Sequence, residues 1–294
     1  MTNRSLYLRS VLALVLVTVI WGSGFIATEY AIASEMDASL IMALRFLLGA
    51  LCVGAFSYKK ITQCDRACIL HGCIAGVILF GAFYTQTLGQ SATTVSNAAF
   101  ITASNVVMIP LIEWALYRKR PSAKVLLMCV VAMVGILLLT VDFTTGLAFG
   151  AGDLLVLLCA FLFAMQIVYV GRTCNDHDPL MITFWQLLAA GVAGTAVFLA
   201  IRPEVTMEHV RLGILPVVYL AVFSTCVCYA LQTWAQKNVP PAPAGVILSM
   251  EGLFGTLFSL MLGLEMFRWS IAAGGALIMT AVVVMNVADA QKDA

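Results

Sequence analysis

The chain has 294 residues and a net charge of +1; 62% of its residues are apolar and only 11% are charged. This balance, with a mean hydropathy of +1.00, leaves too little polar surface for a water-soluble globule and indicates a polytopic membrane protein. The near-neutral charge and the absence of any Lys/Arg stripe exclude a nucleic-acid partner. The nine cysteines lie mostly in apolar runs, where they behave as small apolar residues.

Ten apolar runs of helical length follow one another along the chain. About 20 apolar residues cross a hydrocarbon layer ~30 Å thick, because an α-helix rises 1.5 Å per residue. The predicted transmembrane helices are 10–33, 39–57, 68–90, 94–116, 122–141, 150–171, 179–200, 213–236, 242–264 and 269–288. No small-residue cleavage site follows the first run, which therefore predicts a retained helix and not a signal peptide. We expect no soluble domain and find no phosphate-binding loop for ATP-driven transport.

The second half of the chain repeats the first. Residues 86–90 (QTLGQ) return as residues 232–236 (QTWAQ), a displacement of 146 residues that also sets Asn105 against Glu251. We therefore predict an all-α membrane protein with ten transmembrane helices built from two inverted five-helix repeats, because an odd number of spans inverts the second copy. The expected organisation is a cytoplasmic tail (1–9), the first repeat (10–143), the second repeat (148–288) and a cytoplasmic tail (289–294).

The basic residues predict the orientation of the helices. If the N-terminus is cytoplasmic, twelve Lys and Arg residues lie in cytoplasmic segments, among them Lys60 and Lys237. Only Arg202, Arg211 and Arg268 then lie on the other side. Because cytoplasmic loops carry the excess of positive charge, we expect both termini in the cytoplasm.

Four motifs resemble those of the EamA branch of the drug/metabolite transporter superfamily, and the resemblance covers nearly the whole chain. They are residues 21–25 (WGSGF), residues 44–46 (LRF), residues 99–102 running to Pro110, and residues 249–251 running to 263–265. The resemblance implies a proton- or gradient-coupled carrier or facilitator of small metabolites, often amino acids, commonly exported across a bacterial plasma (inner) membrane. Two positions depart from the family pattern: Gly252 stands where relatives often have proline, and Gly24 where they often have asparagine.

Glu251 is the strongest candidate for a functional side chain. It lies nine residues into a helix expected to start near Ala242, so ~13 Å deep and close to the bilayer centre. Burial there favours the neutral form of the carboxylate, which suits it to exchange a proton or to pair with a cationic substrate. We predict that Glu251 binds substrate and couples transport to protons. The alternative is that it caps a half-helix or bonds a neighbouring helix for packing alone.

Further polar and aromatic side chains are expected around the same site. Asn105 belongs to a polar stripe on the fourth helix, the glutamines repeat between the two halves, and aromatic rings suit stacking and cation–π contacts. The predicted substrate-binding residues besides Glu251 are Trp21, Tyr84, Gln86, Asn97, Ser104, Asn105, Trp185, Gln186, Tyr229 and Gln232. Each has a packing alternative, because polar side chains also join membrane helices and most membrane aromatics pack or lie at the interface.

Other residues within the spans predict gating and an ion pair. Pro110 removes a backbone hydrogen bond and kinks the fourth helix, while Gly252 and Gly255 loosen the ninth, so these three residues are the predicted gating positions. A static kink is the alternative. Arg45 lies inside the second helix and must pair or extend to the interface. We predict a structural ion pair with Glu29, with binding of a substrate carboxylate as the alternative.

The remaining titratable residues predict neither a metal site nor catalysis. Cys64 and Cys68, with Cys174 and His177 in another loop, show no tight ligand spacing, so we expect no metal and no cofactor. The chain offers no catalytic set at membrane depth, which argues against an enzyme. A mid-membrane acid without an obvious mid-membrane base favours zwitterionic or cationic substrates over phosphorylated anions.

The sequence therefore predicts a secondary transporter that moves a small polar metabolite, such as an amino acid, an amine or a related compound, by alternating access, with export as the expected direction. The alternatives are a facilitative channel or uniporter for small solutes and, remotely, an intramembrane enzyme. The expected partners are the small-molecule substrate and the lipid bilayer. Monomer and homodimer are both left open.

Overall fold

The computed structural model describes residues 3–93, 95–140, 150–263 and 266–289. Within these ranges every regular element is a helix, and there is no strand. The helices are α1 (Asn3–Ala33), α2 (Ala38–Ile61), α3 (Arg66–Gln90), α4 (Val95–Ala103), α5 (Asn105–Tyr117), α6 (Ala123–Thr140), α7 (Ala151–Thr173), α8 (Pro179–Ile201), α9 (Met207–Tyr219), η1 (Leu220–Val227), α10 (Cys228–Gln236), α11 (Pro241–Leu248), α12 (Glu251–Met261) and α13 (Trp269–Asp289).

These helices make up the ten predicted segments in the described part of the chain. Eight segments are long and apolar enough to cross a membrane, and α6 and α13 contain shorter apolar helices. Three spans consist of more than one helix: the fourth of α4 and α5, the eighth of α9, η1 and α10, and the ninth of α11 and α12. The predicted all-α membrane fold is confirmed.

Two spans are interrupted at equivalent positions of the repeat. Ser104 separates α4 from α5, and Ser249 and Met250 separate α11 from α12. Each serine hydroxyl donates to the backbone carbonyl three residues earlier, at 2.6 Å for Ser104 and 2.7 Å for Ser249. These bonds satisfy carbonyl groups at membrane depth, where water is scarce. The breaks make Asn105 and Glu251 the first residues of the half-helices that follow.

The break in the fourth span precedes Pro110 and is not caused by it. Pro110 is buried within the continuous helix α5, beyond the break. In the ninth span, Gly255 serves close packing: a Cβ added to Gly22 of α1 would lie 2.7 Å from the backbone nitrogen of Gly255. The breaks therefore lie at serine residues, and not at Pro110 or the glycines to which the sequence pointed. Gating by Pro110, Gly252 and Gly255 stays a prediction.

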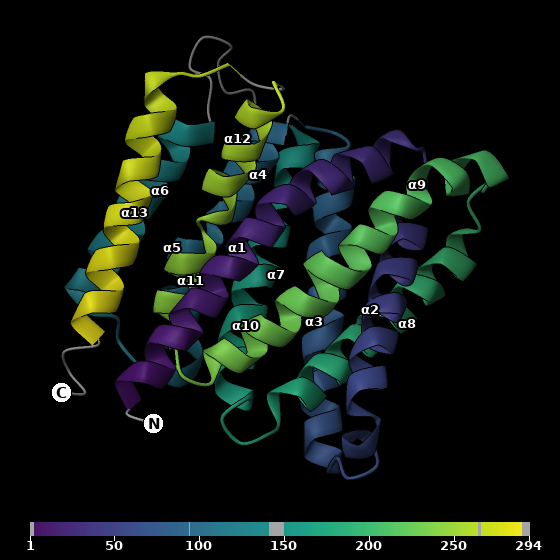
Figure 1. Cartoon of the computed structure of the whole chain (residues 1–294), viewed down its shortest axis with the longest axis horizontal. Helices are drawn as coiled ribbons and strands as arrows, with labels where there is room; N and C mark the ends of the chain where they lie inside the picture. The colour runs from purple at the N-terminus through teal and green to yellow at the C-terminus, as the bar shows by residue number, and fades with distance from the viewer. Residues whose placement is uncertain (1–2, 94, 141–149, 264–265, 290–294) are drawn as a thin grey trace.

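The two halves of the chain interleave. The α2 helix packs along α8, α3 along α7 and α8, α6 along α13, and α1 along α12, and every one of these pairs joins the first half to the second. Figure 1 shows α6 beside α13 and α2 beside α8. The contacts also occur in equivalent pairs. The contact of α3 with α7 corresponds to the contact of the eighth span with α1, and the contact of α1 with the ninth span corresponds to the contact of α7 with the fourth. Two copies related by a two-fold axis have this pattern.

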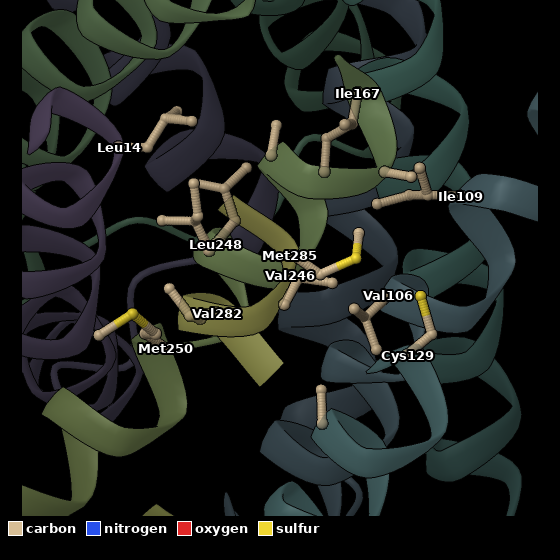
Figure 2. Close-up of a cluster of buried hydrophobic side chains, with 14 of the residues drawn as sticks. Leu14, Val106, Ile109, Cys129, Ile167, Val246, Leu248, Met250, Val282 and Met285 are labelled. Carbon is tan, nitrogen blue, oxygen red and sulfur yellow. The ribbon is translucent and has the colours of Figure 1, made fainter. Parts of the chain in front are cut away.

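Buried apolar side chains form two main clusters, each drawn from both halves. One includes Val106 of α5 and Val246 of α11, and Figure 2 shows it between α1, α5, α6, α7, α11 and α13. The other includes Phe46 of α2 and Leu187 of α8. Trp21 of α1 packs against both clusters. The space between the two apolar cores therefore lies beside Trp21.

Close approach of α3 and α8 depends on Gly76. A Cβ at this position would lie 2.3 Å from the backbone oxygen of Gln186. We expect Gly76→Ala to force the helices apart at a cost of about 1–3 kcal/mol, which a lower thermal unfolding midpoint of the purified protein in detergent will report. Gly252→Ala is the matched control, because the nearest atom to its Cβ would be 3.9 Å away on Leu139. Equal midpoints for the two variants would contradict this account.

Contacts between turns show which helix ends lie together. Lys60 at the end of α2 bonds Asp178 before α8, with 2.7 Å between Nζ and Oδ2. Asn238 after α10 donates to Ser10 of α1 at 3.0 Å. The start of α1 and the end of α13 lie at this same end of the bundle (Figure 1). The basic turns after α2 and α10 therefore share one end.

Candidate functional site

A small cavity of about 60 Å³ lies between the two apolar cores. It is lined by Trp21, Gly24, Phe25, Thr28, Arg45, Phe83, Gln86, Asn105, Phe163, Gln166, Ile167, Ser224, Tyr229, Gln232, Leu248 and Glu251. These residues come from seven of the ten spans, and Asn105 and Glu251 place the cavity beside the breaks in the fourth and ninth. This accessible volume corresponds to a few water molecules.

Both repeats contribute the same positions to this cavity. Four pairs of lining residues are separated by the displacement of 146 residues that relates the two halves: Trp21 with Ile167, Phe83 with Tyr229, Gln86 with Gln232, and Asn105 with Glu251. Equivalent residues of two repeats can lie close together only near the axis that relates the repeats. The cavity therefore lies at the repeat interface, where transporters with inverted repeats hold their substrates.

Glu251 lines the cavity, and its side chain has no hydrogen-bond or ion-pair partner among the described residues. It is the first residue of α12, and the start of this helix has no side-chain capping bond. Among the ion pairs of the described residues, none involves Glu251. A carboxylate at membrane depth is costly unless a proton, water or a ligand compensates it. The functional role of Glu251 stays a prediction, with capping of the half-helix as the alternative.

The ion pair predicted between Arg45 and Glu29 is wrong. Arg45 is 2% exposed, and its Nε donates to Thr225 Oγ1 at 3.1 Å while Nη2 lies 3.5 Å from Ser224 Oγ. Glu29 instead accepts a hydrogen bond of 3.2 Å from Gln90 Nε2. The side chain of Arg45 thus turns from α1 toward the eighth span, where neutral hydroxyl groups accept its bonds and leave its charge uncompensated.

A π-helical stretch, η1, supplies those hydroxyl groups. Its wider turn interrupts the regular α-helical register, a feature often found at functional sites. The backbone oxygen of Ser224 also accepts a bond of 2.8 Å from Trp21 Nε1, which joins η1 to α1. The guanidinium of Arg45 lies 4.2 Å from the ring centroid of Phe83, a cation–π contact. Arg45 is therefore held at the cavity wall by neutral groups.

Buried glutamines form a hydrogen-bonded chain behind the cavity. Gln166 Nε2 donates to Gln186 at 3.2 Å, and Gln232 Nε2 donates to Gln166 at 3.4 Å and to Gln236 at 3.2 Å. Gln166 and Gln232 line the cavity, and Gln186 and Gln236 lie behind them. The Oε1 atom of Gln232 and the hydroxyl group of Tyr229 are buried without a hydrogen-bond partner. Such orphaned groups are costly, which points to water or a ligand in the cavity.

Six of the predicted substrate-binding residues line the cavity: Trp21, Gln86, Asn105, Tyr229, Gln232 and Glu251. Their role in binding stays a prediction. The sequence interpretation missed Gln166 and Phe83. The repeat could have predicted Phe83, because this residue stands 146 residues before Tyr229. Gln166 could have been noticed as a polar residue in an otherwise apolar run.

The other predicted binding residues take different places. Ser104 bonds at the helix break, and Gln186 lies in the glutamine chain. Tyr84 stacks on the phenylalanine one turn earlier, with ring centroids 5.3 Å apart. Trp185 packs edge-on against the preceding phenylalanine, at 5.2 Å, and supports the contact of α8 with α3. The side chain of Asn97 lies outside the described residues.

Comparison with known proteins decides the family. The model of the EamA-like transporter family matches the chain twice, at residues 8–141 and 150–287. The chain belongs to the EamA-like transporter family. Its two matched regions are the two repeats, each with five helical segments, so the predicted family resemblance and duplicated fold are confirmed.

Two curated relatives and one solved structure resemble this EamA-like transporter along nearly its whole length. An "Uncharacterized transporter" of Archaeoglobus fulgidus is 33% identical over 282 residues, which cover 94% of this chain and 85% of the relative. The "Uncharacterized inner membrane transporter YicL" of Salmonella typhimurium is 23% identical over 297 residues, 95% of each chain. A protein of known crystal structure shares the fold with a TM-score of 0.79 at 18% identity, covering 97% of this chain and 99% of the other.

Proposed function

We propose that this transporter is a secondary carrier for a small zwitterionic metabolite of the amino-acid type. The observation that supports this proposal is that one guanidinium, Arg45, and one carboxylate, Glu251, line the same cavity, and neither has an ion-pair partner among the described residues. A zwitterion offers a carboxylate to Arg45 and an ammonium group to Glu251, so one substrate compensates both buried charges.

The charge of Arg45 narrows the substrate class that the sequence suggested. Amines and zwitterions were equally compatible with a cavity that contains an acid and no base. A guanidinium in the cavity wall repels an amine that lacks a carboxylate, and a carboxylic acid that lacks an amine meets repulsion from Glu251. Only a substrate with both groups complements both walls.

Alternating access follows from the small cavity at the interface of inverted repeats. The substrate must enter and leave a space at this interface, and exchange of conformation between the repeats would open such a space to each side in turn. Because the apolar cores contain helices of both halves, the moving bodies are these mixed bundles. The breaks at Ser104 and Ser249 would let the fourth and ninth spans bend, with Pro110, Gly252 and Gly255 as accessory gating positions.

The proposal also covers the orientation of the protein in the membrane, the direction of transport and its coupling to protons. We propose that the end of the bundle that carries the basic turns, with both termini, faces the cytoplasm, because cytoplasmic loops carry the excess of positive charge. Export across the plasma (inner) membrane is the proposed direction, and Glu251 is the proposed proton-coupling group.

Counterflow in proteoliposomes tests the proposal. Vesicles are loaded with an unlabelled amino acid chosen by thermal-shift screening, and uptake of the labelled compound is followed without any ion gradient. We expect saturable counterflow with zwitterionic amino acids and much weaker counterflow with the matching amines and carboxylic acids. Flux that neither saturates nor responds to internal substrate would identify a channel. Preferred transport of the amines would overturn the zwitterion assignment.

A further inference from the structure

Four side chains that bind metals in proteins converge away from the cavity, where two turns meet. Cys64 and Asp65 lie in the turn between α2 and α3, Cys68 lies in the first turn of α3, and His177 comes from the turn between α7 and α8. One ligand atom each of Cys64, Asp65 and Cys68 lies within 4.8 Å of the others. The Nδ1 atom of His177 is 3.6 Å from Oδ1 of Asp65.

We propose that these four residues form a binding site for a thiophilic divalent cation of the zinc type. Tetrahedral zinc with Zn–S distances of about 2.3 Å separates its ligand atoms by ~3.8 Å. The ligand atoms of Cys64, Asp65 and Cys68 lie within 4.8 Å of one another, and His177 reaches the group through Asp65, so rotation of the His177 side chain toward the thiols would complete the set. The proposed ligands are two thiolates, one imidazole and one carboxylate. Thiolate and imidazole ligands favour zinc, whereas magnesium and calcium prefer oxygen ligands alone. The sequence predicted no metal because the ligands come from turns far apart in the chain.

The surroundings leave the site accessible from water. A cavity of about 420 Å³ adjoins the four residues and is also lined by Lys60, Asp176 and Asp178. Asp178 is engaged with Lys60 at 2.7 Å. Asp178 thus balances the nearest lysine, whose charge would otherwise oppose a cation. Cys68 is 2% exposed and Asp65 is exposed, so the site has a buried inner end and an open entry.

Neighbouring groups restrict the ligands in a way that suits a metal centre. Asp65 caps α3 by accepting a bond of 3.2 Å from the backbone nitrogen of Cys68, which fixes the carboxylate beside the thiols and leaves lone pairs free. His71 lies one turn along α3, with its ring centroid 5.5 Å from that of His177, and its Nδ1 is 2.6 Å from Tyr169 Oη. The ring of His71 thus packs against the imidazole of His177. Two of the three histidines of the chain meet here.

A bound ion would join the two halves of the protein. Cys64, Asp65 and Cys68 belong to the first half and His177 to the second, at the end of the bundle that carries the basic turns. The ion would restrain the separation of these turns, and therefore the opening of this end. The binding itself is independent of the proposed substrate, so it is measurable whether or not the transport proposal holds.

Metal titration of the purified full-length protein tests the site. Reduced, chelator-treated protein is titrated with Zn²⁺, and with Co²⁺ to detect the thiolate-to-cobalt charge-transfer absorption. We expect one ion per chain with that absorption. Cys64→Ser and Cys68→Ser should each remove it, and His177→Ala should weaken binding about tenfold or more. Cys73→Ser is the matched control, because this thiol also lies on α3, outside the cluster, and we expect it to bind as the unaltered protein does.

The unaltered protein provides a second measurement that no folding defect can affect. Bound Zn²⁺ should slow maleimide labelling of Cys64 and leave labelling of Cys73 unchanged. The proposal is overturned by equal Zn²⁺ binding in the protein and its Cys64→Ser, Cys68→Ser double variant, by a Co²⁺ spectrum without thiolate absorption, or by labelling of Cys64 that Zn²⁺ does not alter.

Discussion

Replacing Glu251 by glutamine is expected to abolish pH-dependent transport and leave the fold intact. Glutamine has nearly the shape of glutamate but carries no charge and exchanges no proton. Because Glu251 forms no ion pair or capping bond in the described structure, the substitution breaks no protein contact of that kind. Losing the ionic contact to a substrate ammonium group in a buried site costs about 2–5 kcal/mol, which corresponds to a loss of affinity of about 30-fold or more.

The pH profile of counterflow is the decisive measurement for Glu251. We expect the rate of the unaltered protein to change with pH as this carboxylate gains and loses its proton, and residual transport by Glu251→Gln to be flat. Glu113→Gln is the control, since Glu113 pairs with Arg172 at 2.6 Å near the end of α5, outside the cavity. The control should keep the pH dependence. A normal rate and profile for Glu251→Gln would remove this residue from the mechanism.

The duplicated fold and about half of the cavity were predictable because repeats constrain both. The displacement that aligns Gln86 with Gln232 also aligns Asn105 with Glu251, and a symmetric site must collect such pairs near its axis. Applied to Tyr229, the same displacement yields Phe83, which is also in the cavity wall. Internal symmetry thus carries three-dimensional information that a single polar residue in an apolar run lacks.

The direction of each side chain was not predictable, because the spans are apolar on nearly all sides and their pattern does not reveal which face is inside. Trp185 and Tyr84 were expected in the cavity but pack between helices. Arg45 was paired with Glu29, an acid near the end of the first helix. The π-helical stretch that accepts its bonds has only apolar and small residues as a signal. The cluster around Cys68 and His177 depends on the meeting of two distant turns.

Replacing Arg45 is expected to change the substrate selectivity of transport, measured as the ratio of amino-acid to amine counterflow. Arg45→Gln removes the positive charge and keeps a donor for the neighbouring hydroxyl groups. Transport of an amino acid should fall by tenfold or more, because its carboxylate loses a charged partner worth about 2 kcal/mol or more. Transport of the matching decarboxylated amine should rise, because Glu251 still attracts its ammonium group and the repulsion has gone. The ratio of the two counterflow rates is the measured quantity.

Two further variants separate the charge of Arg45 from its geometry. Arg45→Lys keeps the charge and loses the planar, multiply bonding guanidinium, so we expect intermediate amino-acid transport and no gain for the amine. Arg211→Gln, which removes an exposed arginine outside the cavity, should leave the ratio unchanged. An unaltered ratio in Arg45→Gln, with an unchanged thermal midpoint, would show that the guanidinium serves packing alone.

The comparison of Arg45→Gln with Glu251→Gln carries the strongest argument for a zwitterion. If each residue holds one end of the substrate, the first variant shifts selectivity toward amines and the second toward carboxylic acids. General destabilisation lowers the transport of every substrate together and cannot shift selectivity in opposite directions. Opposite shifts therefore require two opposite charges acting on two ends of one ligand, which is the arrangement that the cavity between the repeats presents.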